Sequence, residues 1–333
     1  MRPTILCLII VLIAFVAASS THGQPQQGAT PPQAPRRPAV PKGVRAVLDV
    51  AYVPGPKSHP LQKLDLYVPN DPIEPFRGPR PVIVYVHGGA WRGGDKRNVP
   101  VMSFTAKGYA VASVNYRLSQ DAVFPAQIED CKAAVVWLRR HAKDFQLDPE
   151  RIGAFGESAG GHLVALLGTT GDIQEWGAND QEKTGAKEDG VSSRVQCVVD
   201  WYGPSDLAKM NAQAPSFGTM DHDAPDSPES VLVGGPVQQN KDKAATASPV
   251  TYVTADDAPF LIMHGDKDPL VPIGQSRELA DALKAAGVEV RFETIPAAGH
   301  GGPGFNTPEA RRMVEAFFDK HLKPAAKAAP DGG

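Results

Sequence analysis

The sequence predicts an α/β fold in which a mostly parallel central sheet is flanked by helices and carries long surface insertions. Three observations support this prediction. Short apolar runs alternate with segments of helical periodicity from residue 43 to residue 324. Some of these runs, such as Val82 to Val86, are continuously apolar, as strands buried on both faces are. A glycine-rich turn around Ser158 separates one apolar run from a helical segment.

The composition is that of a globular protein. Hydrophobic residues make up 42% of the 333 residues and charged residues 21%, which is neither a disordered nor a strongly charged composition. A chain of this length buries enough apolar surface to fold without disulfides or a metal. Its net charge of −3 provides no broad positive field for a phosphate backbone, so we expect no nucleic-acid partner.

The N-terminal segment predicts export from the cytoplasm. Arg2 precedes the apolar stretch Ile5 to Ala18, and small and polar residues follow, which is the layout of a secretory signal peptide over residues 1–23. The stretch is shorter than the roughly 20 residues that a membrane-spanning helix needs, so we expect cleavage, with an uncleaved anchor as the alternative. The mature chain is then periplasmic or secreted and has no membrane span. Residues 24–42 are rich in proline and predict an extended, solvated linker.

Residues 43–324 read as a single domain. Leu64, Leu66 and Val68 alternate with polar residues, which predicts a half-exposed early strand. The continuously apolar run Val82 to Val86 predicts the buried centre of the sheet. Further runs predicted to be buried are Tyr109 to Val114, Arg151 to Phe155, Val195 to Trp201, Pro259 to His264 and Val288 to Ile295.

The segments between the strands carry helix signals. Ile128, Cys131, Val135 and Leu138 repeat at helical spacing, Gly287 is a stop signal after an apolar pair, and Thr307-Pro308 is a start signal. Two stretches interrupt the alternation. Residues 171–194 are polar and rich in glycine, and residues 208–250 are rich in Pro, Asp, Ser and Gly, so we expect surface excursions rather than core. The tail 325–333 is expected to be disordered.

Two cysteines lie beyond the predicted signal peptide. Cys131 lies on a helical apolar stripe and Cys197 lies in the apolar run Val195 to Val199, so both are expected to be small core residues. A disulfide between them is the alternative. No cluster of His and Cys has the spacing of a metal site, and we expect neither a metal nor a cofactor.

The most specific motif is Gly156-Glu157-Ser158-Ala159-Gly160, which lies between an apolar run and a helical segment. A Gly-x-Ser-x-Gly motif in this position predicts a nucleophile elbow, a turn so tight that only small residues fit around the exposed serine. The helix that follows also supplies free N–H groups for a developing oxyanion. The alternative is a plain glycine-rich turn with a solvent-facing serine.

A second glycine-rich motif, His87-Gly88-Gly89-Ala90-Trp91, directly follows the strand Val82 to Val86. Without bulky side chains, this backbone can approach a substrate and aim its N–H groups at a carbonyl oxygen. We therefore expect oxyanion donors at Gly89, Ala90 and Ala159. His87 and Trp91 are expected to be structural, and a glycine-rich strand exit without a chemical role is the alternative.

A serine nucleophile needs a histidine base and a carboxylate, which in this fold come later in the chain. Asp266 and Asp268 follow the strand Pro259 to His264, and Asp268 is preferred as the acid, with Asp266 as the alternative. His300 follows the last strand on a loop of small residues and is expected to be the base.

The other polar groups near these motifs are expected to have supporting roles. His162 and His264 lie in buried segments and are expected to be satisfied core groups, whereas the remaining histidines, His222 among them, are placed away from the active edge of the sheet. Glu157 could support the elbow by hydrogen bonding, and Asp206 could serve as a carboxylate behind the triad.

The sequence resembles a known family. The segments HGGAW (87–91), GESAGG (156–161), DWYGPSDL (200–207), HGDKDPLVP (264–272) and AAGHGG (297–302) are similar to those of α/β-hydrolase esterases and lipases, closest to the bifunctional acetylxylan/feruloyl esterase-like group. The resemblance covers roughly residues 43–324. It implies the α/β-hydrolase fold, Ser158 as nucleophile, Asp268 as acid and His300 as base. Ala90 stands where many relatives have a third glycine, which keeps the backbone N–H but reduces backbone freedom.

Together the motifs predict a serine carboxylic-ester hydrolase that forms an acyl-enzyme. No long apolar segment indicates an acyl tunnel, so we expect short acyl groups, and the resemblance adds aromatic and carbohydrate-linked esters of small molecules or polysaccharides. A serine peptidase of the same fold and a non-catalytic binding protein are the alternatives. The oligomeric state cannot be read from the sequence.

Overall fold

The computed structural model describes residues 37–323 apart from 57, 72–77, 172, 174–175 and 177–189, and the described residues belong to one compact unit. The predicted signal peptide (1–23), most of the predicted linker (24–42), much of the stretch 171–194 and the predicted tail (325–333) lie outside the described residues.

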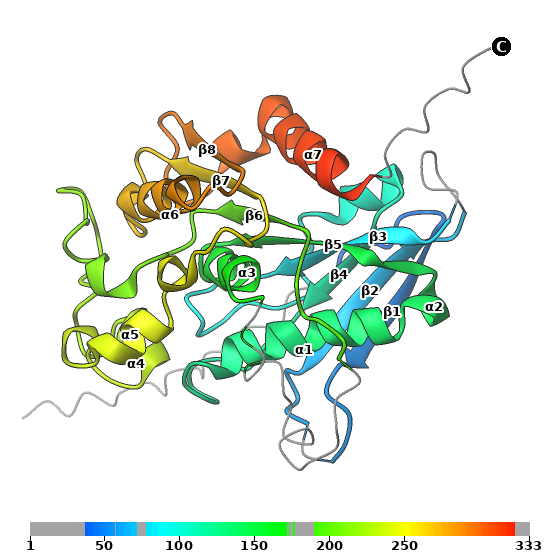
Figure 1. Cartoon of the computed structure of the whole chain (residues 1–333), viewed down its shortest axis with the longest axis horizontal. Helices are drawn as coiled ribbons and strands as arrows, with labels where there is room; N and C mark the ends of the chain where they lie inside the picture. Colours follow the sequence, from blue (N-terminus) through cyan, green and yellow to red (C-terminus); the bar gives the residue numbers. More distant parts are fainter. Residues whose placement is uncertain are drawn as a thin grey trace, which may run out of the picture. The chain divides into compact units, whose positions relative to one another are not determined.

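The described strands form one eight-stranded sheet with the order β1-β2-β4-β3-β5-β6-β7-β8 (Figure 1). They are β1 (Val44–Ala51), β2 (Lys63–Pro69), β3 (Arg80–Val86), β4 (Ala110–Val114), β5 (Leu147–Glu157), β6 (Cys197–Trp201), β7 (Phe260–Gly265) and β8 (Val290–Ile295). β2 pairs antiparallel with both β1 and β4, and every other neighbouring pair is parallel. The predicted mostly parallel α/β sheet is confirmed.

Helices cover both faces of the sheet and give it two cores. Buried residues of α1 (Ala126–Arg140), α3 (Ala159–Thr169) and α6 (Ile273–Ala285) pack with Val82, Val84 and Val86 on one face. On the other face, α7 (Pro308–Leu322) and the 3₁₀ helix η1 (Met102–Lys107) pack with the alternate residues Ile83 and Tyr85. A strand covered on both faces has no polar side, which explains the continuously apolar runs in the sequence. The short helix α2 (Ala142–Phe145) precedes β5.

The early strand β2 is buried on both faces, so the prediction of a half-exposed strand is wrong. Asp65 and Tyr67, the residues expected to face solvent, are both fully buried. The cause is a long-range charge cluster. The Lys96 Nζ donates to Asp65 Oδ1 at 2.5 Å, and Arg37 Nε donates to Asp65 Oδ2 at 3.1 Å. Arg37 belongs to the segment predicted as a solvated linker, and here it contacts the domain.

The two edge strands, β1 and β8, both carry exposed residues. The prediction that Val288 to Ile295 is a buried run is therefore wrong, because β8 lies at the edge of the sheet.

Residues 208–250 also differ from their prediction, because they contribute to the core. They contain most of the 3₁₀ helix η3 (Leu207–Lys209), then α4 (Pro228–Val233), η4 (Val237–Gln239) and α5 (Lys241–Thr246), and η5 (Pro249–Tyr252) begins within them. Leu232, Val237 and Ala244 are fully buried in the same core as α1 and α3. The helices are so short that their few apolar residues produce no clear periodicity in the sequence.

Cys131 and Cys197 are both buried and free, as expected of small core residues. Cys131 belongs to the core on the α3 face and Cys197 to the core on the α7 face. The sheet separates them, so the alternative of a disulfide between them is excluded.

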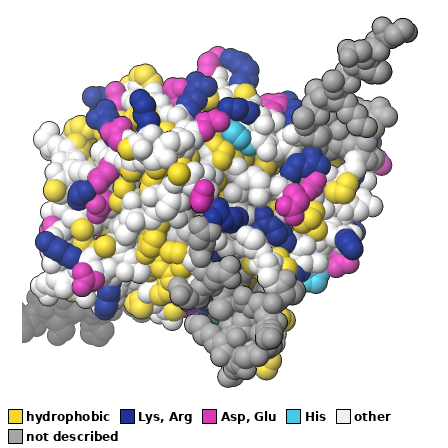
Figure 2. Space-filling model, viewed as in Figure 1, with side chains coloured by type: hydrophobic (Ala, Val, Ile, Leu, Met, Phe, Trp, Pro, Cys, Tyr) yellow, Lys and Arg dark blue, Asp and Glu magenta, His cyan; other side chains and the backbone are white. Residues whose placement is uncertain are grey.

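The surface carries charges of both signs. On the face shown in Figure 2, Lys and Arg side chains are interspersed with Asp and Glu side chains over the described surface. Within the described ranges, no helix has the length and hydropathy that crossing a bilayer requires.

Candidate active site

Ser158 occupies a strained turn between β5 and α3. Its φ of 55° and ψ of −124° lie in a region that residues other than glycine rarely adopt. The turn is tight because a Cβ on Gly156 would lie 2.2 Å from the Gly160 carbonyl oxygen, and a Cβ on Gly160 would lie 2.1 Å from that of Val86. Any side chain at either glycine would force the backbone apart, which explains the spacing of the motif.

Three predicted site residues form one hydrogen-bonded chain. The Nε2 of His300 lies 2.8 Å from Ser158 Oγ, and its Nδ1 lies 2.7 Å from Asp268 Oδ2. Ser158 comes from the β5–α3 turn, Asp268 from the loop after β7 and His300 from the loop after β8, so parallel strands bring all three to one edge of the sheet. The His300 ring packs on Tyr202, with the ring centroids 4.6 Å apart.

The Asp268 carboxylate is fully buried and held from several sides. Its Oδ1 accepts hydrogen bonds from the N–H groups of Leu270 at 2.8 Å and Val271 at 3.0 Å. Burial raises the pKa of Asp268, but hydrogen bonds with His264 and His300 outweigh burial and hold the pKa well below its ordinary value. The carboxylate therefore stays ionised and can stabilise a positive charge on His300.

Asp266, the alternative acid, faces another group. Its Oδ1 accepts the backbone N–H of Ala297 at 2.7 Å, which ties the loop after β7 to the loop that carries His300. The structure therefore brings Asp268 to His300 and gives Asp266 a bond to the backbone. His264 lies in β7 with its Nδ1 2.7 Å from Ser276 Oγ and its Nε2 2.9 Å from the Val271 carbonyl oxygen, as expected of a satisfied core histidine.

The predicted oxyanion loop lies against the elbow. A Cβ on Gly88 would come within 2.8 Å of the Glu157 carbonyl oxygen and 3.2 Å of Ser158 Cβ, so the two loops touch. Gly89, Ala90 and Trp91 all have positive φ, at 112°, 54° and 54°. The N–H groups of Gly89 and Ala90 donate to no acceptor among the described residues. Ala159 is the first residue of α3, where an N–H has no partner within the helix.

Trp91 fixes the end of this loop to α3. Its indole Nε1 donates to His162 Nδ1 at 3.1 Å, so the proton of a neutral imidazole lies on Nε2, which donates to the Ala247 carbonyl at 2.6 Å. Burial lowers the pKa of His162 to about 4, with the Ala247 bond opposing that shift. His162 therefore remains neutral and links the oxyanion loop, the nucleophile helix and residue 247. The structural role of His162 agrees with the prediction that it is a satisfied core group.

A cavity of about 740 Å³ opens at Ser158. Its lining surface is more apolar than polar, although Leu270 is the only large aliphatic side chain among the described residues that line it. The polar side chains that line it include Tyr85, Asp95, Asn98, Glu157 and Tyr202. The Glu157 carboxylate accepts hydrogen bonds from Tyr85 Oη at 2.8 Å and Tyr202 Oη at 3.1 Å. Sequence reasoning gave neither tyrosine a role, because Tyr85 is indistinguishable from a core residue of a buried strand and the segment DWYGPSDL (200–207), which contains Tyr202, contributes only to the family resemblance.

Asp206 does not lie behind the triad, contrary to expectation. It is the N-cap of η3, where its Oδ1 accepts from Ala208 N at 3.1 Å and its Oδ2 pairs with Lys209 at 3.0 Å.

A further buried carboxylate, Asp200 in β6, lies against the start of α3. Its Oδ1 accepts from Gly203 N at 2.9 Å, and a Cβ on Gly161 of α3 would approach this oxygen to 2.4 Å. Its Oδ2 has no hydrogen-bond partner within the part of the chain that the structure describes. Burial raises the pKa of Asp200 to about 7, and the Gly203 bond offsets only part of that rise.

The raised pKa predicts a pH-dependent stability. The pKa of Asp200 is higher in the folded than in the unfolded chain. Its contribution to the free energy of unfolding is therefore complete at acidic pH and is lost as the pH rises through about 7. From about pH 5.5 to about pH 8.5 we expect ionisation of Asp200 to lower the free energy of unfolding by on the order of 2 kcal/mol. Urea unfolding of the wild type and Asp200→Asn over this range measures the difference. The stability of the variant should decrease less, and parallel pH profiles would contradict the assignment.

Comparison with known sequences identifies relatives over most of the domain. The BD-FAE family model matches residues 64–283. Esterase LipQ of Mycobacterium tuberculosis is 33% identical over 276 residues, which are 81% of this chain and 61% of that protein. Esterase LipC of the same organism is 32% identical over 280 residues, 82% of this chain and 65% of that protein. The chain thus spans about half to two thirds of the length of the curated relatives it matches.

Solved structures of other proteins also match this chain over most of its length. A truncated carbohydrate esterase from gut microbiota superposes with a TM-score of 0.70 and 32% identity, covering 84% of this chain and 97% of that one. An acetyl ester-xyloside bifunctional hydrolase from Caldicellulosiruptor lactoaceticus has a TM-score of 0.63 and 26% identity, covering 85% of this chain and 97% of that one.

Proposed function

This chain belongs to the BD-FAE family and has the α/β-hydrolase fold, and from that premise we propose that it is a serine carboxylic-ester hydrolase that uses Ser158, His300 and Asp268. The observation that carries the proposal is the position of His300, whose two ring nitrogens bridge the hydroxyl of a strained serine and a buried carboxylate. Ester hydrolysis by such a triad requires only these side chains and an oxyanion site.

Acylation would begin with proton transfer. His300 Nε2 accepts the proton of Ser158 Oγ while this oxygen forms a bond to the ester carbonyl carbon. The N–H groups of Gly89, Ala90 and Ala159 stabilise the resulting oxyanion. The carbon–oxygen bond to the alcohol then breaks, and the imidazolium of His300, stabilised by Asp268, gives its proton to the departing oxygen.

Deacylation repeats these steps with water as the nucleophile. His300 accepts a proton from water as the water oxygen bonds to the acyl carbon. The bond to Ser158 Oγ breaks, and His300 returns the proton to the serine. The products are a carboxylic acid and an alcohol, and the side chains return to their starting protonation states.

Release of p-nitrophenol from acetate, butyrate and octanoate esters tests the reaction class and the acyl length. We expect the acetate and butyrate to be the better substrates, because Leu270 is the only large aliphatic side chain among the described residues that line the cavity at Ser158, and a long acyl chain would find few aliphatic partners there. A peptide anilide serves as the comparison substrate. Faster cleavage of the anilide than of any ester would favour the peptidase alternative.

We further propose that the alcohol part of the substrate is a carbohydrate. The polar side chains among the lining residues support this, since carboxylate, amide and phenol groups match the hydroxyls of a sugar. Glu157 is the best placed of them, because two tyrosine hydroxyls orient its carboxylate beside Ser158. The names of the two similar solved structures, a carbohydrate esterase and an acetyl ester-xyloside hydrolase, agree with this choice.

Glu157→Gln tests the carbohydrate proposal. The amide keeps one acceptor but loses the charge, and a hydrogen bond to a charged group contributes enough that we expect kcat/KM for an acetylated xyloside to fall about 10-fold further than for p-nitrophenyl acetate. Glu289→Gln, a change at an exposed carboxylate paired with Lys320, is the control. An equal loss on both substrates would show that Glu157 does not distinguish the alcohol group.

We also propose that residues 1–23 direct export and are removed. N-terminal sequencing of the protein recovered from the culture medium or the periplasm should give a start within residues 18–24. Recovery of the whole chain with Met1 from the cytoplasm would contradict this proposal.

A further inference from the structure

A second histidine, His264 near the end of β7, lies beside the acid of the proposed triad. The side chains of His264 and Asp268 are both fully buried, and Nε2 of His264 lies 3.3 Å from Asp268 Oδ2. The same carboxylate oxygen lies 2.7 Å from Nδ1 of His300. Oδ2 of the acid therefore has two imidazole neighbours, and the proposed reaction uses only one of them.

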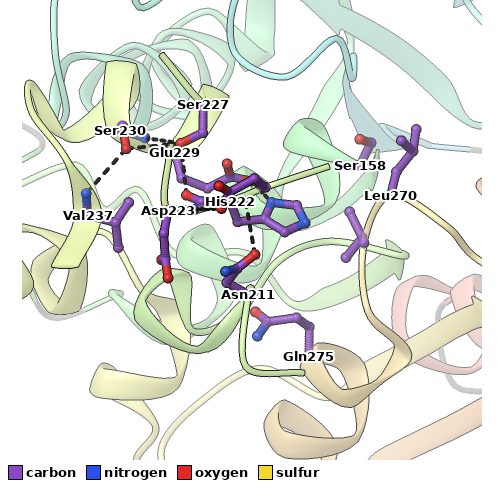
Figure 3. Close-up of polar contacts among 12 residues, drawn as sticks. Ser158, Asn211, His222, Asp223, Ser227, Glu229, Ser230, Val237, Leu270 and Gln275 are labelled. Atoms are coloured by element: carbon purple, nitrogen blue, oxygen red, sulfur yellow. Dashed lines mark hydrogen bonds and ion pairs between the residues drawn. The ribbon is translucent and has the colours of Figure 1, made fainter. Parts of the chain in front are cut away.

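His264 also contacts the backbone that binds the other oxygen of the acid. Its Nε2 lies 2.9 Å from the Val271 carbonyl oxygen, and the N–H of Val271 donates to Asp268 Oδ1 at 3.0 Å. The N–H of Leu270 donates to the same Oδ1 at 2.8 Å. Leu270 and Ser158 both line the cavity, and Figure 3 shows their side chains next to each other. One ring therefore contacts the carboxylate directly and through the loop that forms part of the cavity wall.

The surroundings of His264 define which ring nitrogen carries the proton. Nε2 faces two acceptors, a carboxylate and a carbonyl, so Nε2 is the donor of the neutral ring. Nδ1 is then an acceptor, and it lies 2.7 Å from Oγ of Ser276 in α6. Ser276 is fully buried, and within the described part of the chain its hydroxyl makes no other hydrogen bond. Its single proton therefore points at Nδ1 and keeps the N–H of the ring directed at the acid.

The first turn of α6 is itself fixed, so Ser276 has a defined position. Gln275, the preceding residue, accepts the N–H groups of Ser205 and Asp206 with its Oε1, both at 2.7 Å. Its carbonyl oxygen accepts from Ser205 Oγ at 2.6 Å. The start of α6 is thus bound to the loop after β6 by Gln275 and to β7 by Ser276.

We propose that His264, with its tautomer set by Ser276, is a positioning residue that holds the Asp268 carboxylate toward His300. This inference rests on the proposed triad function. The contacts form a continuous series from Ser276 through His264 and Asp268 to His300 and Ser158. His264 is not among the residues that line the cavity, so it acts on the geometry of the acid rather than on the substrate.

Removal of the ring N–H should loosen the acid at both of its oxygens. Oδ2 would keep only the contact with His300, and the buried carbonyl of Val271 would lose the donor that now satisfies it. A shift of Val271 would move the N–H group that holds Oδ1. The carboxylate could then turn away from His300, which lowers the rate of proton transfer from the serine.

The test compares His264→Leu, which removes the N–H, with His264→Gln, whose amide can place an N–H near the position of Nε2. Ile262→Ala is the matched control, because Ile262 is fully buried two residues earlier on the same face of β7 and has no polar group. Two rates are measured: turnover of p-nitrophenyl acetate, and phosphorylation of Ser158 by diisopropyl fluorophosphate. The second rate reports activation of the serine without an ester substrate.

For His264→Leu we expect kcat and the phosphorylation rate each to fall about 10-fold, with KM changed by less than about twofold. His264→Gln should restore both rates to within about threefold of the wild type, because it retains a donor for the acid. Ile262→Ala should melt at a lower temperature and keep the wild-type rates, since it creates a cavity without touching the acid.

A spectroscopic measurement tests the tautomer without reference to activity. In protein labelled with ¹⁵N-histidine, the His264 signals are assigned by their loss in His264→Gln. At about pH 8 they should show a protonated Nε2 and an unprotonated Nδ1 that accepts a hydrogen bond. In Ser276→Ala the Nδ1 signal should move to that of a nitrogen without a hydrogen bond, and kcat should fall about threefold. A proton on Nδ1 of the wild-type ring would overturn the inference.

Wild-type rates in His264→Leu would also overturn it, and so would equal losses in His264→Leu and His264→Gln. An equal loss in Ile262→Ala would show that the effect comes from folding of β7. If His264→Leu fails to fold, wild-type kcat in Ser276→Ala overturns the inference. A wild type that is phosphorylated but releases no p-nitrophenol would contradict the proposed ester hydrolysis alone, and the phosphorylation rates would still decide the role of His264. Reaction with neither compound would overturn both.

Discussion

Ser158→Ala should abolish ester turnover. Alanine has no oxygen to attack the carbonyl carbon, and loss of the nucleophile of a serine triad lowers kcat by roughly 10³-fold or more, down to what the oxyanion site and binding alone provide. The measurement is release of p-nitrophenol from the acetate ester by the purified variant and the wild type.

The fold of the variant should be unchanged, which separates chemistry from stability. Ser158 already has its strained φ of 55°, and alanine requires the same conformation at a similar cost. Circular dichroism and the melting temperature should therefore match those of the wild type. Equal p-nitrophenol release by a folded variant would show that another residue attacks the ester.

Asp268→Asn should have the second largest effect. The amide oxygen can still accept the N–H groups of Leu270 and Val271, so the loop is expected to keep its shape. The amide nitrogen would then face His300 Nδ1 as a donor and favour the ring tautomer that cannot accept the Ser158 proton. We expect kcat to fall by about 10³- to 10⁴-fold, as when the acid of other serine triads is replaced.

Asp266→Asn is the matched control for the acid. Asp266 is two residues away in the same loop and is hydrogen-bonded to Ala297 N, a bond that an asparagine oxygen can also accept. We expect its kcat to fall by less than about 10-fold. If Asp266→Asn were the more damaging change, the acid would have to be reassigned.

The sequence was most informative where the backbone itself restricts the residue type. Gly156 and Gly160 have no room for a Cβ, so the turn that exposes Ser158 is visible as a motif. The loops that carry Asp268 and His300 follow directly after the strands β7 and β8, and parallel strands bring such loops to one edge. The elbow, the order of the site residues and the parallel sheet could therefore be predicted.

Contacts between distant segments could not be predicted. Asp65 appeared solvent-exposed because Lys96 and Arg37, which neutralise it, lie 31 and 28 residues away. Nothing local shows that Tyr85 and Tyr202 converge on Glu157. In each case the deciding partner is brought close by the fold, and the local pattern carries no information about it.

The most direct test of the account is to identify the residue that reacts with diisopropyl fluorophosphate. Peptide mapping of the inhibited protein should find one phosphoryl group per chain on Ser158, with ester hydrolysis lost in proportion to labelling. Ser158→Ala should remain unlabelled. A label on another residue, or a labelled protein that still hydrolyses p-nitrophenyl acetate, would contradict the assignment of Ser158 as the nucleophile.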